Sequence, residues 1–400
     1  MAAERLTADA IVVGGGPSGL TAAIALASAG LDTVLVARHA PEDGRTTALL
    51  ASSVAALDTL GVWASCRDQA APLRTLRIVD ATARLWRAPE ARFEAHEIGL
   101  DAFAQNIENQ NLVAALERKS IRLANLRRVE DDALSVETDA ERAVVRTQNG
   151  IGIDARLVVG ADGRNSICRA AAGIGIRHWS YPQIALTFNV THSRPHHDIS
   201  TECHTETGPF TMVPLPGNRS SIVCVTDAHD AQTLQACGGE ALDRELERRS
   251  HSILGKMSAE PAGGVFPLAV EIADRFAANR IALIGEAAHR LPPIGAQGLN
   301  LGLRDAAAIA EIAADARDDP GEPEAMARYE TMRRTDLTAR TFAVDLLNRS
   351  LLSDLLPVQG MRGIGMHVMN TVGPLRRAIM REGVMPRVSQ PRLMRGEALT

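Results

Sequence analysis

A short glycine-rich turn between two apolar segments constrains this chain more than any other feature. Residues 9–13 read Asp-Ala-Ile-Val-Val, and glycines follow at positions 14, 16 and 19. An alanine-rich segment then runs to Gly30, and a second apolar run begins at Leu31. This order predicts a strand, a tight turn, a helix and a second strand at 33–36, the unit that places a pyrophosphate on a helix N-terminus. The chain is therefore expected to bind a dinucleotide.

The glycines of this turn have separate expected roles. Gly14 permits the tight turn, Gly16 lets the backbone approach the phosphates, and Gly19 lets the helix pack close to the strand. Pro17 and Ser18 begin the helix and belong to the same predicted binding turn.

The end of the second strand departs from the usual dinucleotide pattern. An acidic residue commonly stands there and holds the adenosine ribose. In this chain the position is Ala37, followed by Arg38. Other groups must therefore hold the ribose, and the candidates are Arg45 and the backbone near Arg38.

Two later motifs repeat the pattern of a strand followed by a glycine turn. The apolar strand 157–159 ends in Gly160-Ala-Asp162-Gly163, and a strand-end aspartate points into the crevice where open α/β sheets bind ligands. The strand 281–284 runs into Gly285-Glu286, and a loop rich in proline and glycine then leads to a helix expected from about Leu299. The N-terminal amides of that helix attract negative charge.

Periodicity predicts the remaining elements. Helical spacing favours helices over 50–60, 106–118 and 326–348. Arg45 is expected in the loop before the first of these helices. Strands are expected at 73–79, 83–87, 134–137 and 143–147, and then at 184–190, 210–214 and 221–226. Because the region from 181 to 266 lacks alternating helices, it is expected to form a separate antiparallel sheet.

Composition excludes several classes of protein. The 400 residues are 46% hydrophobic and 23% charged, as in ordinary globular proteins, and the net charge of −5 argues against nucleic-acid binding. The five cysteines form no C-x-x-C pair, and neither a signal peptide nor a membrane-spanning run is found, so a cytoplasmic location is expected. Loop histidines 192, 196, 197 and 204 are interpreted as surface residues, and no metal site is predicted.

The basic C-terminal region allows two interpretations. Residues 357–400 contain seven arginines against two glutamates, with apolar residues among them. The segment is either an amphipathic element for a membrane surface or partner, or a helix packed on the main domain with a solvated basic face. The second interpretation is favoured, and removal of the residues after Pro386 is expected to leave cofactor binding intact.

The three motifs, in this order and spacing, resemble the class A flavin monooxygenases of the p-hydroxybenzoate hydroxylase superfamily. Within it the chain is similar to the ubiquinone-biosynthesis hydroxylases. Five local runs carry that similarity: Arg45-Thr-Thr-Ala-Leu49 with Leu60-Gly-Val-Trp63, Glu108-Asn-Gln110, Tyr181-Pro-Gln183, Pro293 to Asp305, and Gly373-Pro-Leu-Arg-Arg377.

The resemblance implies a mechanism based on bound FAD. FAD is reduced by NAD(P)H, and a flavin C4a-hydroperoxide hydroxylates the aromatic ring of a phenol, here a (poly)prenylphenol intermediate of ubiquinone biosynthesis. No catalytic side chain is identified, because the flavin performs the chemistry. The partners expected are a small aromatic substrate and, in addition, either the inner-membrane surface or a biosynthetic complex.

The resemblance also assigns cofactor-binding positions. The pyrophosphate would lie at Gly14, Gly16 and Gly19, with Arg45, Gln110 and Asp162 near the phosphates, the ribose or the nicotinamide path. Gly285 and Glu286, where aspartate is usual, would contact the ribityl chain. The isoalloxazine would be lined by Pro293, Gln297, Gly298, Leu299 and Asn300.

The implied fold is α/β, a Rossmann-like FAD-binding domain interleaved with an antiparallel β-sheet substrate domain, plus C-terminal helices. The FAD-binding domain is assigned to residues 1–75, 100–180 and 270–330. The substrate domain takes 76–99 and 181–269, and the C-terminal helical region takes 331–400. Two alternatives remain open: a hydroxylase of another phenol, and a flavin-poor structural subunit of a biosynthetic complex, suggested by Ala37 and Glu286.

Overall fold

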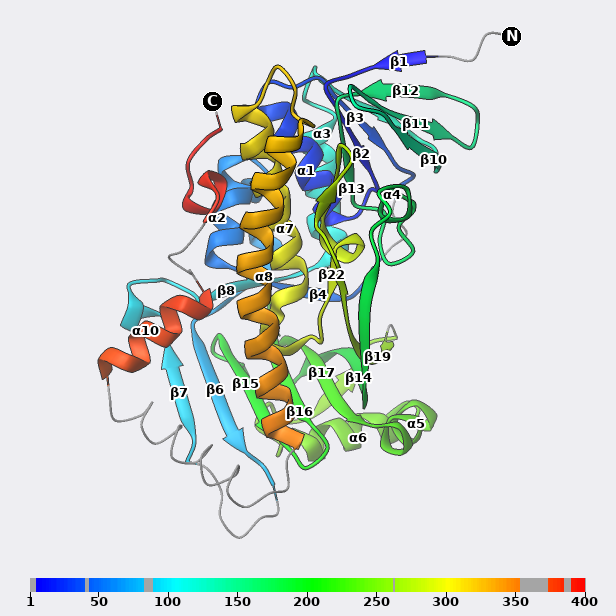
Figure 1. The fold of residues 1–400 in the computed structure, drawn as a ribbon. Coiled ribbons are helices and arrows are strands. Elements are labelled where there is room, and N and C mark those ends of the chain that lie inside the picture. Colours follow the sequence, from blue (N-terminus) through cyan, green and yellow to red (C-terminus); the bar gives the residue numbers. More distant parts are fainter. Residues whose placement is uncertain are drawn as a thin grey trace.

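A six-stranded sheet forms the centre of the upper half of the molecule in Figure 1. The computed structural model describes residues 5–39, 43–82, 89–261, 263–352, 373–384 and 390–399. The strand order of this sheet is β20-β21-β13-β2-β3-β9, parallel except between β20 and β21. Its strands are β2 (Ala10–Val13), β3 (Thr33–Val36), β9 (Leu126–Val129), β13 (Leu157–Gly160), β20 (Ala277–Ala278) and β21 (Ile281–Leu283).

Helices cover this parallel sheet. Helix α1 (Pro17–Ser28) is buried along most of its length because it is apolar on nearly every side, and it packs against α7 (Gln297–Asp315) and α3 (Asn109–Ser120). The helix α8 (Pro323–Leu352) runs along the molecule from this sheet toward the lower half (Figure 1). The short helix α4 (Ile167–Ala171) follows β13.

The second large sheet has nine strands and is mainly antiparallel. Its order is β22-β19-β14-β17-β16-β15-β6-β7, with β18 paired to β14, and β15 lies parallel to β6. Its strands are β6 (Thr75–Asp80), β7 (Ala91–Glu94), β14 (Ile176–His192), β15 (Ile199–His204), β16 (Pro209–Leu215), β17 (Arg219–Asp227), β18 (Met257–Ala259), β19 (Gly264–Ala273) and β22 (His289–Arg290). Helices α5 (Ala228–Ala236) and α6 (Glu240–Arg249) lie at its lower end (Figure 1).

Two smaller sheets complete the architecture. One joins β1 (Arg5–Thr7), β12 (Gly152–Ala155), β11 (Ala143–Thr147) and β10 (Ala133–Thr138). The other joins β4 (Thr46–Leu50), β8 (Ala104–Glu108) and β5 (Ala70–Leu73). After β4 comes α2 (Ala51–Thr59), and α10 (Gly373–Val384) packs beside β7.

The α/β fold class predicted from the sequence is confirmed, and so are the strand at Thr33–Val36, the β10–β11 pair and the antiparallel strands β14, β16 and β17. The domain boundaries stay a prediction. The expected strand at 83–87 and the whole segment 353–372 lie outside the described residues.

Two local predictions were wrong. Residues 106–108 belong to β8 and not to the following helix, because Asn106 pairs with Ala48 and Ala71 in the three-stranded sheet. The Asn106 amide also donates to the carbonyl of Pro214 at 2.9 Å, which fixes β8 against the large sheet. Arg45 precedes a strand, β4, before α2 begins at Ala51.

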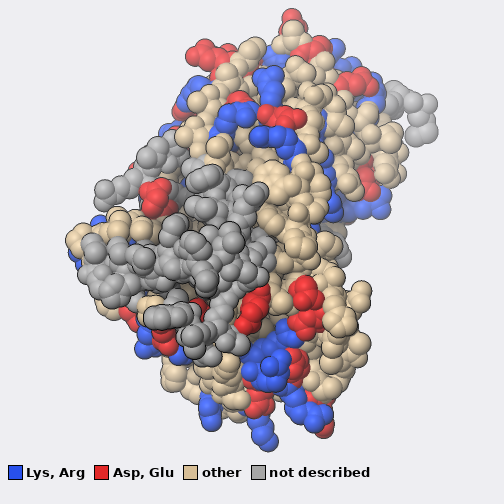
Figure 2. Space-filling model, turned by 60° about the horizontal axis from the view of Figure 1, so that its bottom comes forward, with Lys and Arg blue, Asp and Glu red and all other residues tan. Residues whose placement is uncertain are grey.

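On the face shown in Figure 2, basic side chains lie interspersed with acidic ones.

Candidate cofactor site

The glycine turn between β2 and α1 has the geometry that its sequence predicts. Gly14 has φ +114°, and a Cβ there would lie 2.2 Å from the carbonyl oxygen of Ala161. A Cβ on Gly19 would lie 2.0 Å from the carbonyl oxygen of Gly14. Larger residues at either position would therefore force the turn apart.

Gly16 differs from these two glycines because its surroundings are open. It is the N-cap of α1 and makes no side-chain cap, and a Cβ placed on it would meet no atom within 4 Å beyond its chain neighbours. The first turn of α1 contains no acidic side chain. The N-terminal amides of α1 thus face open space and can receive an anion such as a pyrophosphate.

The first and third motifs meet at Ser18. A Cβ on Gly285 would lie 3.1 Å from Ser18 Oγ, and a Cβ on Gly302 of α7 would lie 2.2 Å from the same oxygen. Gly285 itself has φ +57°, so the turn after β21 depends on glycine. Two segments from opposite ends of the sequence are thereby brought into one site.

Arg45 and Gln110 come together at Asp43. The Arg45 guanidinium makes two hydrogen bonds of 2.8 Å to the Asp43 carboxylate, and the backbone nitrogen of Gln110 donates to the backbone carbonyl of Asp43 at 3.2 Å. The guanidinium also lies over the Phe266 ring, 5.4 Å from its centroid. This cluster joins the loop before β4 to strand β19.

The charges around Arg45 support one another. The hydrogen bonds to Asp43 raise the pKa of Arg45 against the effect of burial, and the charges of Asp43 and Glu286 add to the rise. Burial by itself would raise the pKa of Asp43, but its hydrogen bonds to Arg45 and Asn109 hold that pKa below its ordinary value. Glu286 is exposed and lies within electrostatic reach of Arg45.

Asp162 lies next to the glycine turn, but its carboxylate is directed into its own loop. Its backbone nitrogen would be 2.9 Å from a Cβ on Gly14. Its carboxylate accepts hydrogen bonds from Ser166 Oγ at 2.6 Å and from the Cys168 amide at 3.1 Å, at the start of α4. The backbone of this turn therefore borders the site while the side chain stabilises the turn.

The loop after the Gly285 turn leads to the N-terminus of α7. Gln297 begins α7, two residues earlier than expected, and the preceding Ala296 has φ +53°. Pro293 and Gly298 are exposed, Gln297 and Leu299 are half-buried, and a Cβ on Gly298 would meet no atom within 4 Å. The segment predicted to line the isoalloxazine thus presents an open helix N-terminus.

Asn300 is buried and serves as an internal connection. Its Oδ1 accepts from the Leu50 amide at 2.8 Å and from Ser53 Oγ at 2.7 Å. Its Nδ2 donates to the carbonyls of Ala48 at 2.8 Å and Ala296 at 2.7 Å. The side chain therefore joins α7 to β4 and α2.

Arg38 does not turn toward the glycine motif. Its side chain pairs with Asp132 at 2.9 Å, and both side chains are at least half exposed. Ala37 is buried, and its Cβ lies 2.8 Å from the place of a Cβ on Gly15. Its methyl group offers no hydrogen bond to a ribose.

A buried ion network that was not predicted from the sequence lies behind this site. The Asp305 carboxylate accepts from the Gly285 amide at 3.0 Å and from Arg333 Nε at 2.6 Å, and it lies 2.7 Å from His289 Nε2. Arg333 also pairs with Asp336 at 2.9 Å. A sequence signal was present, because His289 and Asp305 both belong to the stretch that carries the third motif.

The network favours the charged forms of Asp305 and Arg333. Burial alone would raise the pKa of Asp305, but the charges of Arg333 and His289 keep it below its ordinary value. Burial alone would lower the pKa of Arg333, and the charges of Asp305 and Asp336 raise it instead. Burial raises the pKa of the nearby Tyr329 hydroxyl, which donates to the carbonyl of Leu283 at 2.8 Å.

The expectation that the four loop histidines are surface residues was wrong in part, because His192 ends strand β14 and is buried, and His204 ends strand β15. Three of the four are engaged in local hydrogen bonds or ion pairs. His192 Nδ1 lies 2.8 Å from the carbonyl oxygen of Arg194, and His196 Nε2 lies 3.0 Å from that of Leu215. His204 pairs with Glu202 at 2.6 Å. Across the part of the chain that the structure describes, no group of three potential ligands is arranged for a metal ion.

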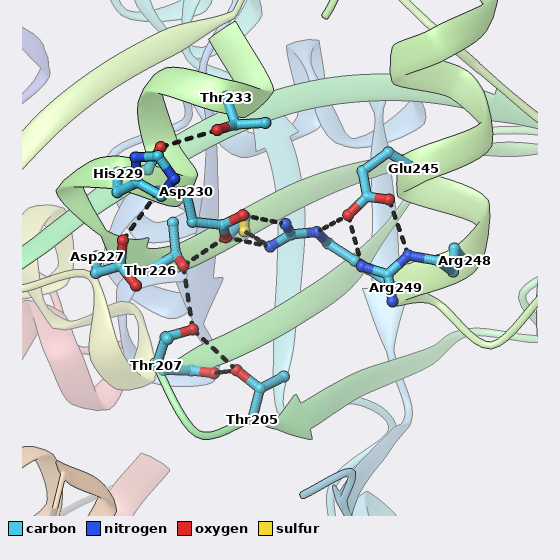
Figure 3. Close-up of polar contacts among 12 residues, drawn as sticks. Thr205, Thr207, Thr226, Asp227, His229, Asp230, Thr233, Glu245, Arg248 and Arg249 are labelled. Carbon is cyan, nitrogen blue, oxygen red and sulfur yellow. Dashed lines mark hydrogen bonds and ion pairs between the residues drawn. The ribbon is translucent and has the colours of Figure 1, made fainter. Parts of the chain in front are cut away.

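A cavity of about 350 Å³ lies between α5 and α6, apart from all of these motifs. Figure 3 shows Arg249 between Asp230 of α5 and Glu245 of α6, with contacts of 2.7 Å to each carboxylate. Thr226 Oγ1 donates to Asp230 at 2.7 Å and connects this network to β17. The charges here neutralise one another and hold the two helices on the sheet.

These residues fit an FAD molecule. The open N-terminus of α1 suits a pyrophosphate, and the open N-terminus of α7 suits the pyrimidine end of a flavin. A further donor, Arg128 Nη2, is buried beside Gly15 without a hydrogen-bond partner among the described residues.

Comparison with known proteins agrees with this fit. A sequence model of the family described as "FAD binding domain" matches residues 7–341. The ubiquinone hydroxylase UbiL of Rhodospirillum rubrum is 36% identical over 408 residues, covering 98% of this chain and 94% of the relative. The 3-demethoxyubiquinol 3-hydroxylase of Escherichia coli is 29% identical over 384 residues, covering 92% of this chain and 96% of the relative.

A solved structure shares the fold. The p-nitrophenol 4-monooxygenase PnpA of Pseudomonas putida superposes with a TM-score of 0.79 at 18% identity, covering 96% of this chain and 99% of PnpA. The chain therefore belongs to the FAD-binding-domain family of flavin monooxygenases, as a member of the group that contains the ubiquinone hydroxylases.

Proposed function

We propose that this protein uses FAD, NAD(P)H and O₂ to hydroxylate the aromatic ring of a prenylated phenol in ubiquinone biosynthesis. The observation that carries the proposal is the 36% identity to a ubiquinone hydroxylase across 98% of the chain. The meeting of the glycine turn with the Gly285 turn at Ser18 supports it, because both motifs border one site.

The chain's own residues would hold and orient the reacting groups. The amides that begin α1 would bind the pyrophosphate, and those that begin α7 would lie against the flavin ring. Glu286, exposed beside Arg45, would contact the ribityl chain. FAD, when bound, supplies the redox chemistry that activates oxygen, so no side-chain nucleophile is required.

The substrate would approach from the large sheet. Two small apolar clusters include residues of its strands. In the first, Val213 of the large sheet packs, partly buried, against Leu50, Leu73 and Ala104 of the three-stranded sheet. The second consists of residues of the large sheet, namely Ala185, Val225 and Leu268 with the partly buried Tyr181. Apolar surroundings suit an aromatic ring with a prenyl tail, and they exclude water from the reacting atoms.

We also propose that the protein associates peripherally with an anionic membrane through α10. Met380 and Val384 pack on the cluster around Phe93, and Arg376 pairs with Glu97 at 2.8 Å, so one side of the helix is anchored. The rest of the helix exposes Leu375 and Ile379, at 44% and 46%, on one flank and Arg377 and Arg381 on the other. A helix that exposes both apolar side chains and arginines suits an anionic lipid surface.

No helix within the described ranges is long and apolar enough to cross a bilayer. Vesicle co-sedimentation therefore tests attachment to one leaflet. The Leu375→Glu/Ile379→Glu variant is expected to lose binding to phosphatidylglycerol vesicles while keeping its melting temperature. Leu134→Glu, which alters a residue 63% exposed on β10, is the matched control. Equal binding by both variants, or no binding by the wild type, would contradict the proposal.

The reaction is tested first by the visible spectrum of the purified protein. A yellow protein, bleached by NADH or NADPH and recoloured by oxygen, is expected. A protein that stays colourless with added FAD would favour the structural-subunit alternative. A deletion strain then identifies the substrate class: accumulated prenylphenol with reduced ubiquinone supports the proposal, whereas normal ubiquinone points to a hydroxylase of another phenol.

A further inference from the structure

The ribose end of the FAD site lacks its expected acid. The side chains of Arg38 and Arg45 are engaged elsewhere, whereas the backbone carbonyl oxygen of Arg38 lies 3.1 Å from the place of a Cβ on Gly15. Ala37 occupies the acid's position at the end of β3. Arg38 pairs with Asp132 at 2.9 Å, and Arg45 makes two hydrogen bonds to Asp43. A ribose hydroxyl in this place can donate to the Arg38 carbonyl, and its oxygen would still need a hydrogen-bond donor.

Arg128 on β9 supplies a polar group at this position. Strand β9 pairs with β3 so that Arg128 lies beside Leu35, one register position before Val36. The Arg128 Nε donates to the carbonyl of Ala37 at 3.2 Å, and its Nη1 donates to Glu117 at 3.0 Å. These two bonds fix the guanidinium against the end of β3.

The remaining guanidinium nitrogen, Arg128 Nη2, has no hydrogen-bond partner among the described residues and is buried. If Gly15 carried a Cβ, that atom would lie 3.9 Å from Arg128 Nη2 and 2.8 Å from the Cβ of Ala37. Arg128 Nη2 and Ala37 therefore border the same point of the glycine turn. A buried donor without a partner carries a desolvation cost, so the arrangement is more favourable when a ligand oxygen comes within its reach. Glu117 balances the charge, which leaves Nη2 to act as a donor.

We propose that Arg128 takes the place of the missing carboxylate and donates a hydrogen bond to an adenosine ribose hydroxyl of FAD. A carboxylate would accept a hydrogen bond from that hydroxyl, whereas the guanidinium donates to its oxygen. The exchange is chemically allowed because a hydroxyl is both donor and acceptor. The proposal rests on FAD binding and is independent of the aromatic substrate.

The test compares FAD with FMN, which lacks the adenosine. Flavin-free protein is titrated with each flavin, and binding is followed by the quenching of flavin fluorescence. Arg128→Met is expected to weaken FAD binding about tenfold or more and to leave FMN binding unchanged. Arg127→Met, which alters the exposed neighbour on β9, is the matched control and is expected to change neither.

Two further measurements separate a ligand contact from a structural role. The melting temperature of flavin-free Arg128→Met is expected to stay close to that of the wild type. Adding Ala37→Glu to Arg128→Met is expected to restore FAD affinity, because the carboxylate then returns. Equal losses for FAD and FMN, no loss for either, or failure of the rescue would overturn the proposal. A wild type that binds neither flavin would overturn FAD binding itself.

Discussion

The carboxylate of Asp305 accepts a hydrogen bond from the amide of Gly285, with 3.0 Å between Oδ2 and the nitrogen. This contact ties helix α7 to the turn that carries Glu286. Because Arg333 of α8 neutralises the same carboxylate, three separate segments depend on one buried charge.

Replacing Asp305 by Asn should therefore destabilise the protein by about 3–5 kcal/mol, since the buried Arg333 would lose one of its two carboxylate partners and would share Asp336 with Arg304. Urea unfolding measures the loss. Asp315→Asn, on the same helix but 41% exposed, is expected to cost less than about 1 kcal/mol. Equal effects of the two substitutions would contradict the importance of the buried network.

Gly16 and Gly14 should respond in opposite ways to substitution. Gly16→Val is expected to keep the fold, because its side chain enters open space, and to abolish FAD binding by filling the place of the pyrophosphate. Gly14→Ala is expected to lose about 3 kcal/mol or more of stability, because its Cβ would collide with the Ala161 carbonyl at φ +114°. Thermal melting and FAD titration distinguish the two effects, and a stable Gly14→Ala protein would argue against this turn geometry.

Asn300→Ala should loosen α7 from β4. The substitution removes four hydrogen bonds, two of them buried, and takes the acceptor from the Leu50 amide and the Ser53 hydroxyl, which predicts a loss of about 3 kcal/mol in the free energy of unfolding. FAD affinity is expected to fall with it, because the start of α7 loses its support. Asn165→Ala, at an exposed position, is the control and should leave both quantities unchanged.

His192 should make the stability of the large sheet depend on pH. Burial lowers the pKa of its imidazole, and the neighbouring His196 ring, 5.8 Å away between centroids, acts in the same direction. The unfolded chain therefore binds the proton more readily. The stability that depends on the neutral ring is complete above about pH 6.5 and falls as the pH drops toward the folded-state pKa.

Unfolding measured at pH 7.5 and 5.5 tests this dependence. The wild type is expected to lose more stability than His192→Gln over this interval. His229→Gln, at an exposed position, should behave as the wild type. A wild-type loss that His192→Gln fails to reduce would assign the pH dependence to other groups.

The C-terminal residues should matter for stability, whereas the expectation that cofactor binding survives removal of the residues after Pro386 stays a prediction. Leu393, Met394 and Leu399 are buried in the main core, and the Arg392 amide bonds to Glu311 of α7. Ending the chain at residue 389 exposes the surface that they cover and should cost about 4 kcal/mol or more. Full stability and FAD affinity in this truncated protein would show instead that the segment is dispensable.

Much of this protein was determined by local sequence. The glycines at 14, 16 and 19 between two apolar runs specify a phosphate-binding turn, because backbone sterics and helix dipoles act within a few residues. The strands β3, β10 and β11 could be predicted for the same reason, since alternation and apolar runs are properties of short segments.

Only the tertiary structure decided which side chains remain available at the site. Asp162, Asn300 and Arg45 have the residue types expected of ligand contacts, yet each side chain is engaged in bonds within the protein. Arg128 showed no motif in the sequence, because its position depends on the parallel pairing of β9 with β3. Hydrogen bonds between distant segments form only after the chain has packed, so sequence spacing predicts the turn while tertiary contacts select its polar partners.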